Sequence, residues 1–308
     1  MKAKNLISIR DLSASDVSEI FELAAEMKRS PEDYRDALRG RTLGMIFEKK
    51  STRTRVSFEV GIYQLGGMGL FLSSSDIQLG RGETVADTAR VLSRYVDGVM
   101  ARTYAHADMV ELARHASVPV VNGLSDLLHP CQALTDYFTL AEKKQDLKGG
   151  KIAYVGDGNN MCHSLLYGAN KVGMNIAIAT PEHYEPKAII MKSANREAAH
   201  VGVTVSLSHD PAGAVEGADA VYTDVWASMG QEVEAEKRKA AFQDYQVNAD
   251  LMARAKPDAV FMHCLPAHRG EEVTAEVLDG PQSVVFDQAE NRLHVQKAIL
   301  YLLMGGSS

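Results

Sequence analysis

Apolar residues along this chain form short continuous runs in some segments and recur at helical spacing in others. In the first part of the chain the two kinds of segment alternate. Short apolar runs indicate buried strands, and apolar residues three or four positions apart indicate amphipathic helices. The pattern predicts strands over 42–47, 68–72, 98–101 and 118–121, and helices after Ser13, after Ser51, over 84–95 and over 106–115. Strands that alternate with helices predict a parallel sheet with helical crossovers.

The same alternation starts again in the second part of the chain. A helix over about 131–144 leads into a polar, glycine-ended joint at 146–150. Further strands are expected over 151–155, 175–179, 203–207, 218–223, 259–262 and 283–286, with helices up to 169, over about 186–199 and over 291–304. The predicted fold class is α/β, with two doubly wound domains, each a central parallel sheet flanked by helices, joined by interdomain helices. In such folds ligands bind beyond the carboxyl ends of the strands, often between domains.

Composition limits the classes of function. The chain has 308 residues, of which 45% are hydrophobic, which suits two domains of about 150 residues with real cores. Its 33 basic and 40 acidic residues give 33 − 40 = −7, so we expect no binding to nucleic acid or to an anionic membrane. No apolar run approaches the roughly 18–20 residues of a membrane helix. We therefore expect a cytoplasmic protein that binds any anion through local arginines and helix ends.

Cysteine usage predicts neither a disulfide framework nor a metal site. The three cysteines contain no CxxC pair, and each is expected to be a free thiol. A zinc site would have to draw on His129, Cys131, His263, Cys264 and His268. These residues fall in two predicted domains without a reliable ligand spacing, so we expect no metal and no cofactor.

The segment from Ser51 to Arg55 has the character of an anion site. It lies between a predicted strand and an amphipathic helix, and Ser51 is a favourable N-cap. Unpaired backbone N–H groups, the helix dipole, hydroxyls and a guanidinium together form a cradle for phosphate. The alternative is an ordinary capped helix with solvated basic residues.

Other polar residues follow predicted strands. Arg102 comes directly after one strand, and His129 and Gln132 open the linking helix after another. Histidine in such a place is often structural. Gly156 and Gly158 also follow a strand, but Met161 stands where a dinucleotide fingerprint requires its third glycine. We therefore expect no NAD, and the amides of Asn159 and Asn160 are expected to point into the cleft.

Three motifs, in this order, resemble the aspartate/ornithine carbamoyltransferase family. They are Ser-Thr-Arg-Thr-Arg at 51–55, His-Pro-Cys-Gln at 129–132 and His-Cys-Leu-Pro at 263–266. The resemblance runs from about Leu6 to the last helix. The Ser-Met-Gly segment at 228–230 and Cys264 are similar to the ornithine-specific branch rather than to the aspartate or putrescine enzymes.

The resemblance implies an enzyme that moves the carbamoyl group of carbamoyl phosphate to the side-chain amine of L-ornithine, giving citrulline, in arginine biosynthesis. Its implied catalytic residues are Cys264, Arg102 and His129. Carbamoyl phosphate would be bound by Ser51, Thr52, Arg53, Thr54, Gln78, Arg102, His129, Gln132, Cys264, Leu265 and Arg292. Ornithine would be bound by Asn160, Asp224, Ser228 and Met229, with Asp224 at the α-ammonium.

The resemblance also implies domain roles and an assembly. Residues 1–132 would form the carbamoyl phosphate domain, with the helix at 288–308 packing back on it, and residues 133–287 the ornithine domain. Gln78 resembles the residue that this family sends into a neighbouring subunit's site, which implies a homotrimer or a multiple of trimers. A carbamoyltransferase for another amine, such as putrescine, and a catalytically silent relative remain as alternatives.

Overall fold

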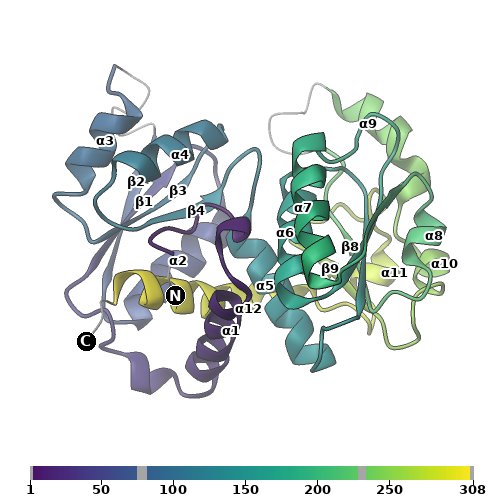
Figure 1. Cartoon of the computed structure of the whole chain (residues 1–308), viewed down its shortest axis with the longest axis horizontal. Helices are drawn as coiled ribbons and strands as arrows, with labels where there is room; N and C mark the ends of the chain where they lie inside the picture. Colours follow the sequence, from purple (N-terminus) through teal and green to yellow (C-terminus); the bar gives the residue numbers. More distant parts are fainter. Residues whose placement is uncertain (1–2, 75–81, 228–233, 306–308) are drawn as a thin grey trace. The chain divides into compact units, whose positions relative to one another are not determined.

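The computed structural model describes residues 3–74, 82–227 and 234–305. Its contacts divide the chain into two compact units. The first contains the residues up to Thr135 and those from Glu290 onward, and the second runs from Asp136 to Ala289. Figure 1 shows a sheet with helices around it in each unit. Each unit is described by itself.

The first unit is built on a parallel sheet of four strands in the order β2-β1-β3-β4. These are β1 (Thr42–Phe47), β2 (Met68–Ser73), β3 (Gly98–Arg102) and β4 (Val120–Leu124). The central strand β3 is buried throughout, since both faces of a parallel sheet are covered. The helices of the unit are α1 (Ala14–Arg29), α2 (Thr52–Gln64), α3 (Val85–Leu92) and α4 (His106–His115), with 3-10 turns at Ile9–Asp11 and Pro31–Tyr34.

Local sequence determines where several of these helices begin. Ser13 and Asp16 form a capping box at α1, in which each side chain binds the other residue's backbone N–H. Thr84 caps α3 and Ser51 caps α2 in the same way, by accepting from the backbone three residues on. These caps satisfy donors that a helix start leaves without partners.

The second unit is built on a parallel sheet of five strands in the order β7-β6-β5-β8-β9. They are β5 (Lys151–Val155), β6 (Asn175–Ala179), β7 (Val205–Ser208), β8 (Ala220–Thr223) and β9 (Val260–His263). Helices of this unit are α6 (Asn160–Val172), α7 (Ala188–Val201), α8 (Pro211–Val215), α9 (Ala235–Phe242), α10 (Ala249–Met252) and α11 (Ala275–Leu278), with a 3-10 turn at Gln243–Tyr245. Two further helices, α5 (Pro130–Lys144) and α12 (Val285–Met304), contain the unit boundaries.

The predicted fold class is confirmed, since both units carry a parallel sheet flanked by helices. The strand expected over 283–286 is wrong. Ser283 makes only an isolated bridge to Phe261, and α12 begins at Val285. A short apolar run cannot be assigned to strand or helix by periodicity alone, and here the run becomes the first turn of the last helix. Within the described ranges, no helix combines the length and apolarity needed to cross a bilayer.

Candidate functional site

The start of α2 contains the residues that were predicted to bind an anion. Ser51 has extended backbone (φ −164°), and its hydroxyl accepts from the backbone N–H of Thr54 at 3.2 Å. The helix follows β1, so its first turn lies at the carboxyl end of a central strand. Thr52 is exposed, Arg53 is half-buried and Thr54 is fully buried. The predicted cap is therefore present, and the first turn offers hydroxyls and backbone N–H groups to a ligand.

Two buried arginines converge on the hydroxyl of Thr54. Arg292, on α12, donates to Thr54 Oγ1 at 2.9 Å and to Gln132 Oε1 at 3.1 Å. Arg102, the last residue of β3, reaches the same hydroxyl at 3.5 Å. The exposed fractions of Arg292 and Arg102 are only 3% and 6%. Arginines this deeply buried normally need an anionic partner, so this end of the first unit suits a bound anion.

His129 lies at the same site and stays uncharged. Burial, followed by the positive charges of Arg292, Arg102 and Arg53, lowers its pKa well below the ordinary 6.5. A neutral imidazole offers one N–H donor and one acceptor. His129 can therefore donate a hydrogen bond to a bound oxygen without adding a charge. The contribution of Arg53 to this pKa shows that Arg53 also lies within electrostatic reach.

Lys49 is a cation of this region to which the sequence analysis gave no role. Its ammonium lies 4.7 Å from the centre of the Tyr104 ring. Burial and then the charge of Arg102 lower its pKa. Its position just after β1, beside Glu48, was the sequence feature that could have indicated a role for it.

Cys131, by contrast, donates to the carbonyl of Asn122. Burial raises the pKa of its thiol to about 12, so this thiol is inert.

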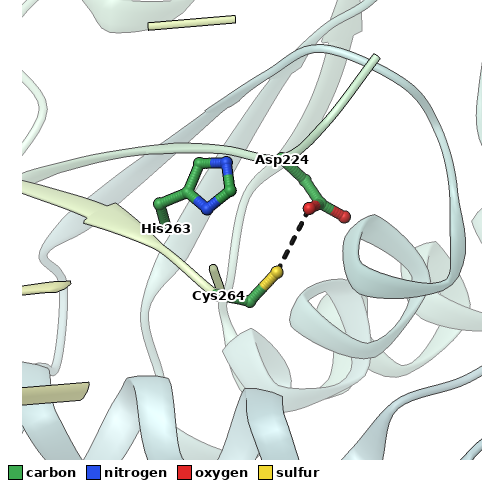
Figure 2. Close-up of side chains that lie close together, drawn as sticks. All are labelled: Asp224, His263 and Cys264. Atoms are coloured by element: carbon green, nitrogen blue, oxygen red, sulfur yellow. Dashed lines mark hydrogen bonds between the residues drawn. The ribbon is translucent and has the colours of Figure 1, made fainter. Parts of the chain in front are cut away.

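In the second unit, Asp224 and Cys264 come together at the ends of neighbouring strands. Asp224 follows β8 and Cys264 follows β9. The thiol of Cys264 donates to Asp224 Oδ1 at 3.1 Å, as the dashed line in Figure 2 shows. Cys264 is partly exposed, whereas Cys131 and Cys162 are buried. A carboxylate beside an accessible thiol suits a ligand that carries an amine.

Asn159 holds Asp224 in place, a role that the sequence analysis did not assign. Its amide N–H donates to Asp224 Oδ2 at 2.8 Å. Its carbonyl accepts from the backbone of Met161 and Cys162 and so caps α6. Asn160, the predicted ligand-binding amide, is the first residue of that helix and is half-buried. Ser228, Met229 and Gln78, which were also predicted, lie outside the described residues.

A buried pair supports the turn that carries Cys264. His263 Nδ1 accepts from the backbone N–H of Leu265 at 2.8 Å, so the proton of the ring sits on Nε2. That nitrogen lies 3.3 Å from Glu272 Oε1, and both side chains are fully buried. The pair links the end of β9 to a loop residue further along the chain. Leu265 is therefore positioned through its backbone.

The described residues contain two groups with the donor atoms of a metal site. One is Asp224, His263 and Cys264, and the other is His268, Glu271 and Glu272. In the first, the thiol already donates to the carboxylate, and His263 Nδ1 is occupied by Leu265. In the second, Glu272 accepts from the backbone of His268. A metal ion would have to displace these bonds, so we assign no metal role to either group.

A buried ion pair lies within electrostatic reach of Asp224 in the second unit. Arg238 Nη1 donates to Asp157 Oδ2 at 3.0 Å and to the carbonyl of Trp226 at 2.7 Å. Burial raises the pKa of Asp157 to about 6, and Arg238 opposes that rise. Arg238 therefore joins Asp157, in the loop after β5, to the backbone of Trp226.

Comparison with known families gives a consistent result over both units. Residues 4–142 match the model of the "Aspartate/ornithine carbamoyltransferase, carbamoyl-P binding domain". Residues 148–303 match that of the "Aspartate/ornithine carbamoyltransferase, Asp/Orn binding domain". The second match includes most of α12, although contacts place the residues from Glu290 onward in the first unit.

Individual relatives are similar over nearly the full length. An ornithine carbamoyltransferase of Thermococcus kodakarensis is 58% identical, covering 99% of this chain and 98% of that protein. The solved ornithine carbamoyltransferase of Pyrococcus furiosus has 57% identity and a TM-score of 0.95, covering 99% of this chain and 98% of that one. The more distant ornithine transcarbamoylase of Giardia lamblia, at 35% identity, has a TM-score of 0.91 and covers 100% of both chains.

Proposed function

This chain belongs to the aspartate/ornithine carbamoyltransferase family, and we propose that it transfers the carbamoyl group of carbamoyl phosphate to the side-chain amine of L-ornithine. The products are L-citrulline and phosphate, in arginine biosynthesis. The observation that carries the choice of acceptor is the contact between Asp224 and Cys264. A carboxylate suits the α-ammonium of ornithine, whereas aspartate would call for additional cations there.

The first unit is proposed to bind carbamoyl phosphate. The donor carries about two negative charges at neutral pH. Arg53, Arg102 and Arg292 supply three positive charges, which compensate both the bound anion and the phosphate that leaves. Ser51, Thr52, Thr54 and Gln132 supply further hydrogen-bonding groups. Groups already held in place stabilise developing charge without reorganisation.

The carbonyl of the donor gains negative charge when the amine attacks its carbon. Arg102 and neutral His129, with Gln132, are proposed as donors to that oxygen. The C–N bond forms, the C–O bond to phosphate breaks, and the electron pair leaves with the phosphate. Because His129 is neutral near pH 7, it acts here as a hydrogen-bond donor rather than as a general acid.

The second unit is proposed to bind ornithine through Asp224, Asn160, Ser228 and Met229. Cys264 is proposed to contact the reacting amine. Cys264 and Leu265 are also proposed to contribute to binding of carbamoyl phosphate. A free amine of this kind has a pKa of about 10.4, so deprotonation at pH 7 costs about 4.6 kcal/mol. Desolvation and nearby arginines lower that cost by disfavouring the ammonium. The proposed proton acceptor is the thiolate of Cys264, whose protonated form donates to Asp224 Oδ1 at 3.1 Å.

An amine-panel assay tests this function. Purified chain receives carbamoyl phosphate with ornithine, putrescine, acetylornithine or aspartate, and product and phosphate are measured. Saturable citrulline formation with ornithine, and none with aspartate, is the expected result. Preferential turnover of putrescine would assign another amine. Binding of a phosphonate analogue without any turnover would identify a catalytically silent relative.

We further propose a homotrimer, or a multiple of trimers, in the cytoplasm. The edge strand β2 and the adjoining helix α2 expose large apolar side chains, with Tyr63 77%, Met68 58% and Val56 51% exposed. Exposed apolar residues on an edge strand and its neighbouring helix are typical of an interface. The free thiols of all three cysteines suit a reducing compartment. Light scattering should give a mass about three times that of the chain or a multiple of that value, and a monomer would contradict the proposal.

A further inference from the structure

Arg292 has a third neutral partner besides Thr54 and Gln132. Gln296 lies one turn further along α12, on the same face of the helix. With its amide oriented to suit its neighbours, its side-chain carbonyl accepts from Arg292 Nε at 3.2 Å and from Nη2 at 3.1 Å. Its amide nitrogen donates to Ser57 Oγ, on α2, at 2.6 Å. The side chain of Gln296 is fully buried, so water cannot replace these bonds.

These contacts run from the guanidinium of Arg292 through Gln296 and Ser57 to the backbone carbonyl of Arg53. The two end groups determine which atom donates in every hydrogen bond between them. A guanidinium only donates, and a backbone carbonyl only accepts. Ser57 donates its single proton to the carbonyl of Arg53 at 2.7 Å, so its oxygen must accept from Gln296. Gln296 must therefore present its carbonyl to Arg292 and its amide nitrogen to Ser57. Only a side chain with an acceptor and a donor on one carbon fits this position.

We propose that Gln296, with Ser57, is a positioning residue for carbamoyl phosphate, because it orients Arg292 and ties that arginine to the first turn of α2. The inference rests on the proposed role of Arg292 in binding the donor. Gln296 leaves the guanidinium charge intact while fixing its direction. Neutral carbonyl, amide and hydroxyl groups thus hold the Arg292 guanidinium in position before carbamoyl phosphate binds. Preorganised donors of this kind contribute strongly to binding and catalysis.

Two substitutions at this position separate orientation from charge. Gln296→Met keeps the volume and removes all three hydrogen bonds of this side chain. Gln296→Glu places a carboxylate on Arg292 and withdraws the donor that Ser57 requires. We expect the KM for carbamoyl phosphate to rise about tenfold in the first and about a hundredfold in the second. The KM for ornithine, at saturating carbamoyl phosphate, should stay within about twofold because that unit is not altered.

Direct binding of inorganic phosphate, measured by calorimetry, keeps this test separate from that of the function. The dissociation constant should rise in the same order even if the chain turned over no ornithine. Gln64→Met is the matched control. Gln64, the last residue of α2, also binds a cation across these helices, by accepting from Lys297 of α12 at 3.0 Å. Its phosphate binding should be unchanged.

Unchanged phosphate binding and an unchanged KM for carbamoyl phosphate in both Gln296 variants would overturn the inference. Equal losses for the two substrates would also overturn it, since that result marks a purely structural role. If Gln296→Met fails to fold, Ser57→Ala decides the matter. It should weaken phosphate binding about threefold, because it removes one end of the same chain of contacts. In a double variant the two effects should be less than additive.

Discussion

The two units orient side chains of opposite charge, arginines in the first and an aspartate in the second. In the first, Arg102 and Arg292 are buried among the hydroxyl of Thr54 and the amides of Gln132 and Gln296. In the second, Asp224 is held by the amide of Asn159 and the thiol of Cys264. In each case neutral groups form hydrogen bonds with a charged side chain and orient it. A site arranged in this way retains the charge for a ligand of opposite sign, an anion in one unit and an ammonium in the other.

The effect of the surrounding charge also differs between the units. In the first unit burial and three arginines lower the pKa of His129. In the second, burial raises the pKa of Asp157 to about 6, although Arg238 opposes it. Both shifts favour the neutral form, as desolvation does for any ionisable group. The difference is that arginines reinforce the shift of a base and oppose the shift of an acid.

The strongest test of the comparison is removal of a cation from the first unit. Arg102→Met keeps most of the side-chain volume at the end of β3 and removes the guanidinium. We expect kcat/KM for carbamoyl phosphate to fall about a thousandfold, because the lost donor stabilises both the anion and the charge on the carbonyl oxygen. Steady-state kinetics with each substrate varied in turn measures this. A loss confined to ornithine, seen as a raised KM for ornithine with an unchanged KM for carbamoyl phosphate, would reverse the assignment of the two units.

The complementary change is Asp224→Asn in the second unit. The amide keeps the shape of the carboxylate but loses the charge that pairs with the α-ammonium. We expect the KM for ornithine to rise about a hundredfold, as for truncation of a hydrogen-bonded charge pair. Phosphate binding to the first unit should not change, and calorimetry measures that directly. If the variant bound ornithine as tightly as the unaltered protein, Asp224 would not be part of the ornithine-binding site.

A further expected effect is on stability, through Asp157. Its folded pKa of about 6 lies above the ordinary 3.8, so between these values the folded state binds more protons than the unfolded state. The stabilising contribution is complete below pH 4 and is lost as the pH rises through about 6, on the order of 3 kcal/mol at most. Asp157→Asn should remove this slope. Urea unfolding from pH 4 to pH 7 measures it, and parallel profiles for the two proteins would contradict the shift.

Much of the fold follows from local pattern. The strands at Thr42–Phe47, Lys151–Val155 and Asn175–Ala179 and the helix at His106–His115 have the predicted limits. The caps at Ser13 and Ser51 also form as predicted. Periodicity failed at 283–286, where a short apolar run became the start of α12. Such a run suits either element, and contacts with distant residues decided between them.

What the sequence by itself determined is the order of strands and helices, the helix caps and the residue types at strand ends, since these depend on neighbours a few positions away. Only the tertiary structure brought Arg292 to Thr54, Gln296 to Ser57 and Asn159 to Asp224. These partners lie far apart along the chain. Their hydrogen bonds depend on how the sheets and helices pack, which no local pattern of hydrophobic and polar residues encodes.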